Sequence, residues 1–100
     1  MKTKLEIARE EINSIDKEMI ELFKKRIDAA RLVAEYKKGN NLPIFDEARE
    51  KSLIEKNLKL LNDKSLEEYY LTFINGMLKA SKDFQAEVMK EENIWNVMHY

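Results

Sequence analysis

The chain has 100 residues, enough for a single domain, and 44% of them are hydrophobic, which allows a modest core. Its 18 lysines and arginines nearly balance 19 aspartates and glutamates, so the net charge of -1 gives no reason to expect nucleic acid or an anionic membrane as a partner. The absence of cysteine excludes disulfides, thiol catalysis and zinc–cysteine sites.

The opening MKTKLEIARE lacks the apolar segment of a secretory signal, and no stretch approaches the roughly 18 apolar residues of a membrane span. We therefore expect a cytoplasmic protein. Two glycines, one proline and 37% charged residues favour long helices, so the expected fold class is all-α, with three helices.

Residues 3–38 contain no helix breaker and predict one very long N-terminal helix. Apolar residues recur along it at alternating steps of three and four, the spacing of a helix that buries one face. We call the first part of this series the apolar stripe: Leu5, Ala8, Ile12, Ile15, Met19 and Leu22. The series resumes at Ala29, Val33 and Tyr36.

The segment GNNLP is the strongest loop signal in the chain. Gly39 is expected to end the first helix in a left-handed conformation. Asp46, a favourable N-cap residue just after Pro43, is expected to begin a second helix that stops near NDKS.

Ser65 and Glu68 form a capping-box pattern that predicts the start of a third helix, which continues to about Lys90. The segment 91–100 is apolar but too short to classify. The expected organisation is one helical domain over residues 1–90, followed by a tail of unknown role.

The first helix is too long for a compact domain of this size. About 36 residues span roughly 54 Å, whereas a 100-residue domain has a radius of gyration of about 13 Å. The apolar stripe would then face water, which is unfavourable. We expect an intertwined homodimer in which this helix pairs with its counterpart in an antiparallel orientation. A kinked helix or a monomeric helical hairpin is the alternative.

Polar residues interrupt the apolar faces. Arg26 stands where the series of apolar residues calls for a leucine, and Lys37 follows 11 positions later on nearly the same side of the helix. On the third helix, Ser81 and Gln85 occupy positions that continue an apolar face. Buried cations without acidic partners require an anionic ligand, and a small anion with two charges fits this set.

The start of the second helix adds Asp46, Arg49 and Glu50 within one turn. The plainer interpretation is that Arg26 forms an internal ion pair with an acid such as Asp28, Asp46 or Glu50, and that the other charges are solvated. Arg9 lies about 25 Å before Arg26 along the helix, so it could reach the same anion only from the partner chain of an antiparallel dimer.

The sequence resembles the all-helical (type II) class of chorismate mutases over about residues 5–85. The resemblance rests on REEINSID, KKRIDAARLVAEYKK, PIFDEARE and SKDFQ, in this order and spacing. It implies an intertwined three-helix homodimer that converts chorismate, a dianion, to prephenate in phenylalanine and tyrosine biosynthesis. Trp95 and His99 have no counterpart in the family pattern.

The resemblance also implies a role for each family position. Lys37 and Gln85 would donate to the ether oxygen of chorismate. Glu50 and the segment at Asp46 would receive the substrate hydroxyl. The carboxylates would be held by a further group of side chains, the last from the partner chain: Arg26, Arg49, Ser81 and Arg9.

The rearrangement is a concerted [3,3] shift that needs no nucleophile, metal or cofactor, so none is expected. Catalysis would come from selecting a compact conformer and stabilising developing charge. Two alternatives remain open at this point: isochorismate pyruvate lyase on the same fold, and a non-catalytic helical dimer or regulatory module.

Overall fold

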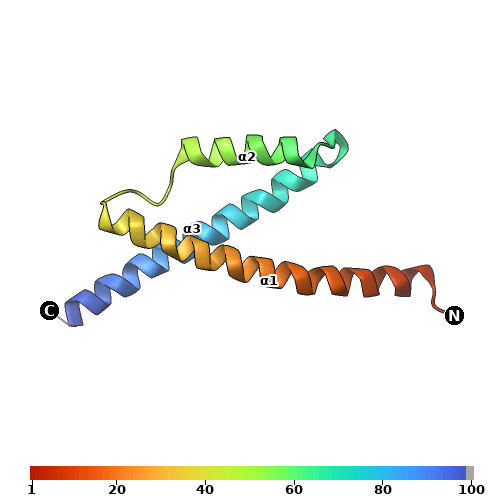
Figure 1. Ribbon diagram of the computed structural model, residues 1–100, viewed down its shortest axis with the longest axis horizontal. Helices are drawn as coiled ribbons and strands as arrows, with labels where there is room; N and C mark the ends of the chain where they lie inside the picture. Colours follow the sequence, from red (N-terminus) through yellow and green to blue (C-terminus); the bar gives the residue numbers. More distant parts are fainter. Residues whose placement is uncertain (99–100) are drawn as a thin grey trace.

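The protein is described by a computed structural model, which covers the backbone of residues 1–98 and the side chains of residues 1–90. Within that range every regular element is helical, which confirms the all-α prediction (Figure 1). The elements are α1 (Lys4–Gly39), α2 (Glu47–Leu61), the short 3₁₀ helix η1 (Lys64–Leu66) and α3 (Glu67–Met98). The side chain of Trp95, and His99 as a whole, lie outside the described residues.

The long N-terminal helix is confirmed: α1 has 36 residues. Thr3 and Glu6 form a capping box that satisfies its first N–H groups. The prediction that Gly39 ends it in a left-handed conformation is wrong, because Gly39 is still helical and the left-handed residue is Asn41, with φ of 54°. The backbone and side-chain N–H groups of Asn40 both donate to the Tyr36 carbonyl, which closes the helix without a left-handed glycine.

Helix α2 begins as predicted, because the Asp46 carboxylate accepts a hydrogen bond of 3.0 Å from the backbone N–H of Arg49. The capping box predicted at Ser65 is wrong. The Ser65 hydroxyl instead donates to the Asp63 carboxylate at 2.6 Å, and Asp63 caps η1. Ser65 lies inside η1 and is therefore not in the N-cap position that a capping box requires.

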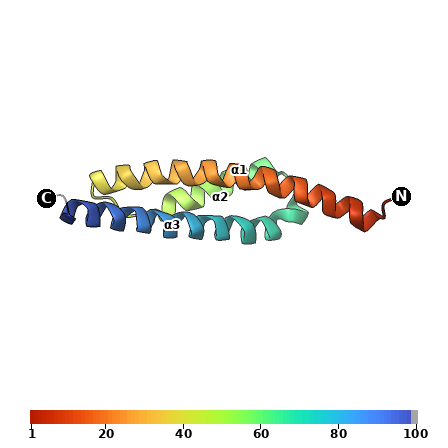
Figure 2. The same ribbon diagram turned by 90° about the horizontal axis from the view of Figure 1, so that it is seen from below.

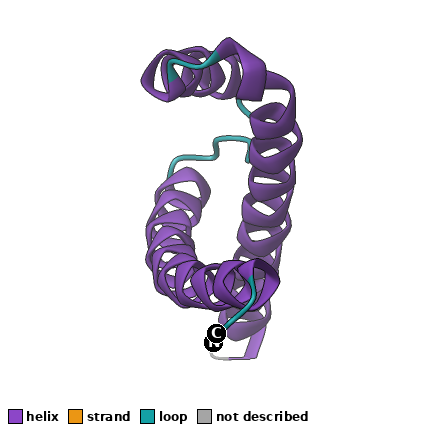
Figure 3. Ribbon diagram, turned by 90° about the vertical axis from the view of Figure 1, so that its right-hand side faces the viewer, coloured by secondary structure: helices purple, strands orange, loops and turns teal. Residues whose placement is uncertain are grey.

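Helices α1 and α3 cross and form the core of the chain. Figures 1 and 2 show α3 passing alongside the second half of α1, and Figure 3 shows α1 and α2 on the same side of α3. Ala30 and Ala34 are the buried residues of α1, and their small side chains let α3 approach closely. They pack where α3 buries its own apolar face: Ile74, Leu78 and Val88.

The chain is elongated, with extents of 65 × 31 × 15 Å and a radius of gyration of 18.1 Å. A compact chain of this length would have a radius of about 13 Å. The first half of α1 extends beyond the other helices, and its apolar stripe is exposed, for example 54% at Ile12 and 62% at Leu22. Within the described part of the chain, no helix has the length and apolar character needed to cross a membrane.

Candidate active site

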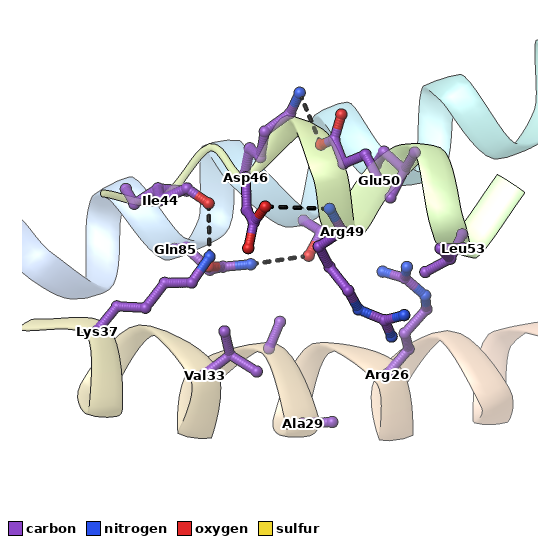
Figure 4. Close-up of a pocket in the computed structure, with 14 residues that line it drawn as sticks. Arg26, Ala29, Val33, Lys37, Ile44, Asp46, Arg49, Glu50, Leu53 and Gln85 are labelled. Carbon is purple, nitrogen blue, oxygen red and sulfur yellow. Dashed lines mark hydrogen bonds and ion pairs between the residues drawn. The ribbon is translucent and has the colours of Figure 1, made fainter. Parts of the chain in front are cut away.

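A cavity of about 340 Å³ lies between the three helices, close to the crossing of α1 and α3 (Figure 4). Helix α1 supplies one wall, the loop before α2 and its first turns a second, and α3 the third. Seven predicted site residues, which are far apart in the sequence, line it together: Arg26, Lys37, Asp46, Arg49, Glu50, Ser81 and Gln85. The eighth, Arg9, lies on the exposed first half of α1 and does not line it.

The α1 wall carries two cations separated by apolar residues. Arg26 and Lys37 project into the cavity from the same face, with Ala29 and Val33 between them (Figure 4). The Lys37 ammonium donates to the backbone carbonyl of Ile44 at 2.7 Å, which fixes it next to the loop that leads into α2. An ammonium has three donors, so Lys37 retains hydrogen-bonding capacity for a ligand.

The α2 wall holds two acids and a second guanidinium. Asp46 is occupied in capping the helix, and the Glu50 carboxylate pairs with Lys82 of α3 at 3.0 Å. In the part of the chain whose side chains are described, neither Arg26 nor the Arg49 guanidinium has a carboxylate within ion-pair distance. The internal ion pair considered for Arg26 is therefore not formed, and both guanidinium groups are available to an anion.

The α3 wall contributes two buried polar side chains. Ser81 and Gln85 are each 7% exposed, and the amide nitrogen of Gln85 donates to the Ser81 hydroxyl oxygen at 3.1 Å. The amide oxygen of Gln85 is buried and has no hydrogen-bond partner. A buried polar atom without a partner is unfavourable, so the amide is poised for a ligand that completes its hydrogen bonding.

The cavity is electropositive. Its lining contains four cations, of Arg26, Lys37, Arg49 and Lys82, and two carboxylates, of Asp46 and Glu50, which leaves a net charge of +2. Because the side chains come from three helices, a small anion inside would contact all of them at once. A ligand with two negative charges would balance the lining.

Sequence reasoning missed two contributors. Lys82 lines the cavity but was not predicted. The prediction named only Ser81, which precedes it, and Gln85, three positions after it. The backbone carbonyl of Ile44, which accepts from Lys37, was also missed. A lysine next to a buried serine on α3 was a usable signal, whereas a loop carbonyl has no signature in the sequence.

A family model described as chorismate mutase type II matches residues 8–86, which is most of the chain. The chain belongs to the chorismate mutase type II family. The part matched by the type II chorismate mutase model contains all eight predicted site residues, from Arg9 to Gln85, and excludes the segment 91–100.

Two relatives carry this family domain within longer proteins. The bifunctional chorismate mutase/prephenate dehydratase of Buchnera aphidicola subsp. Schizaphis graminum (strain Sg) is 44% identical over 64 residues, covering 64% of this chain and 17% of the relative. The protein of the same name from Buchnera aphidicola subsp. Acyrthosiphon pisum (strain APS) is 37% identical over 86 residues, covering 85% of this chain and 22% of the relative. The chain thus spans about a fifth of the length of these relatives. No solved structure matches it.

Proposed function

We propose that this chain is a chorismate mutase, an isomerase that rearranges chorismate to prephenate on the route to phenylalanine and tyrosine. The observation that carries the proposal is the cavity lining of net charge +2, in which neither Arg26 nor Arg49 has an acidic partner among the described side chains. Chorismate carries two carboxylates, so its charge matches this surplus. Membership of the type II family supports the same reaction.

In this proposal, the guanidinium groups of Arg26 and Arg49 bind the two carboxylates of chorismate. Planar guanidinium groups form paired, charge-assisted hydrogen bonds with carboxylates, which fixes the orientation of the ligand. The Ser81 hydroxyl accepts from Gln85 and keeps its own O–H to donate to one carboxylate. Glu50 and the capped segment at Asp46 receive the substrate hydroxyl, for which a carboxylate oxygen is a good acceptor.

Lys37 and Gln85 stabilise the transition state. In the concerted rearrangement the ether C–O bond breaks while a new C–C bond forms within the same molecule, and negative charge develops on the ether oxygen. Lys37 and Gln85 line the cavity from α1 and α3, and both would donate to that oxygen (Figure 4). The Gln85 amide nitrogen carries two N–H donors; one bonds the Ser81 oxygen, and the other is left for the ether oxygen.

No bond to the protein and no proton transfer are required, so the rate comes from geometry and charge. The cavity confines chorismate in the folded conformer that brings the two reacting carbons together, which removes the entropy of finding that conformer. Because the donors are held by three helices, they need little rearrangement as the charge develops. No cofactor or metal takes part in this proposal.

The active form proposed here is a cytoplasmic homodimer in which Arg9 of the second chain completes the cavity. The exposed apolar stripe supports this, since the exposed fraction of its large side chains in the single chain ranges from 42% at Met19 to 62% at Leu22. Burying such a stripe against a second copy is favourable by about 25 cal/mol per Å². Arg9 borders the stripe, so pairing along it brings an additional cation towards a partner.

The test is to add purified protein to chorismate and follow its disappearance, with prephenate identified as the product by mass. Isochorismate is assayed in parallel, because a lyase would release pyruvate from it. Rapid conversion of chorismate without pyruvate release from isochorismate supports the mutase. Release of pyruvate without prephenate would show that the cavity performs the lyase reaction, and inactivity on both would refute an enzymatic role.

A further inference from the structure

Lys82 makes contacts at the cavity that no role described so far uses. Its ammonium pairs with the Glu50 carboxylate at 3.0 Å and lies 4.8 Å from the centre of the Phe45 ring, within range of a cation–π contact. Phe45 and Glu50 flank Asp46, the residue that begins α2. One lysine of α3 therefore holds both sides of the entry into α2.

The packing of α2 makes these contacts important. No residue of α2 is fully buried, so apolar packing alone holds the helix weakly within the chain. Among the described side chains, two polar contacts join it to α3: Lys82 to Glu50 at the start, and Asn57 to the Tyr70 hydroxyl, at 2.9 Å, further along. The contact at the start is the one at the cavity, and it is partly shielded, with Lys82 34% and Glu50 23% exposed.

The ion pair between Lys82 and Glu50 also fixes the position of the Glu50 carboxylate. Lys82 engages one carboxylate oxygen, Oε1, and among the described residues no hydrogen bond is made to Oε2. Without Lys82, the carboxylate would be attracted to the free guanidinium groups of Arg26 and Arg49, which line the same cavity. Such a pair would neutralise a cation that the substrate needs.

The geometry points to Lys82 as a positioning residue of the mutase, one that holds Glu50 and the entry of α2 in place and keeps Glu50 away from the substrate-binding arginines. It acts through Glu50 and does not touch the reacting atoms. This inference rests on the proposed function for its effect on the rate. Its effect on the order of the α2 entry is independent of any reaction.

The experiment compares Lys82→Met, Lys82→Arg and the control Lys79→Met in the full chain. Lys79 lies one turn earlier on the same helix and pairs with Asp83 at 2.7 Å, but it is exposed and does not line the cavity. We expect Lys82→Met to lower kcat/KM by about tenfold to hundredfold, since misplaced groups cost this much. Lys82→Arg should restore most of the rate, and Lys79→Met should leave it unchanged.

Two readouts separate positioning from a general charge effect. In the Glu50→Gln background, Lys82→Met should lower kcat/KM by less than about twofold, because coupled residues are not additive. Amide hydrogen exchange over residues 40–50 should be several-fold faster in Lys82→Met and unaltered in Lys79→Met. Both results support the inference; equal losses in the two backgrounds, or unaltered exchange, overturn it. A wild-type chain inactive on chorismate refutes the proposed function, while the exchange comparison still decides whether Lys82 orders the α2 entry.

Discussion

Replacing Arg26 with alanine tests whether this cation serves a ligand or the fold. The guanidinium lines the cavity and, among the described side chains, has no ion-pair partner, so its removal breaks no internal salt bridge. Two charge-assisted hydrogen bonds to a carboxylate are worth about 1.5–3 kcal/mol each. Since Arg26 is only half-buried, the lower value applies, and a loss of about 3 kcal/mol lowers kcat/KM by about 10²-fold. The carboxylate left unpaired in the cavity raises this towards 10³-fold.

The stability of the fold should be nearly unaffected by Arg26→Ala. Removing one cation from a lining of net charge +2 relieves repulsion, and only the contacts of the aliphatic stem are lost. We therefore expect the free energy of unfolding to change by less than about 1 kcal/mol, measured by urea titration and circular dichroism. Lys25→Ala is the matched control, because Lys25 is exposed, adjacent, and does not line the cavity. Loss of helical structure in Arg26→Ala, or a fall in kcat/KM of less than about tenfold, would refute the reasoning.

Three further predictions concern the amide and the dimer. Gln85→Glu should be active at low pH and lose activity as the pH rises through the pKa of the new carboxyl, because only its protonated form donates; a flat rate between about pH 5 and 8 would exclude Gln85 from the ether-oxygen role. Ile15→Glu places a charge in the apolar stripe and should yield single chains in analytical ultracentrifugation, whereas an unaltered mass would place the dimer contact elsewhere. Arg9→Ala and Arg26→Ala should each be nearly inactive, but chains mixed by co-refolding should recover about a quarter of the wild-type activity, since half of the pairs are mixed and each has one intact site. A mixture no more active than its components would contradict a shared site.

Much of the fold follows from local rules that the sequence expresses directly. Helix α1 runs uninterrupted because 36 residues carry no helix breaker. Asp46 caps α2 because an aspartate that follows a proline-containing loop has few other hydrogen-bond donors to accept from. The errors occur where neighbours compete. Asp63 caps a 3₁₀ turn that places Ser65 inside it, and Asn40 closes α1 in place of a left-handed Gly39. In both cases a neighbouring side chain made a hydrogen bond that the expected motif did not include.

The candidate site was predictable in its composition and less so in its contacts. Periodicity placed Arg26 on an otherwise apolar face, and the crossing of α1 and α3 brings it to the same cavity as Gln85. The partner of Glu50 was not predictable, because Lys82 is one of many lysines and only the angle between helices selects it. Ion pairs between side chains of different helices depend on how the helices pack, and the spacing of residues along one helix does not predict that packing.

The two alanines at the helix crossing have a consequence for how the cavity could evolve. Ala34 on α1 is completely buried and does not line the cavity, whereas Ala30 is buried to a slightly lesser extent and does line it. Their methyl groups set the clearance between the two helices. A larger residue at position 34 would push α1 and α3 apart and so widen the cavity, without changing any side chain that contacts the ligand. Substrate fit can thus be adjusted from a position that the substrate never contacts.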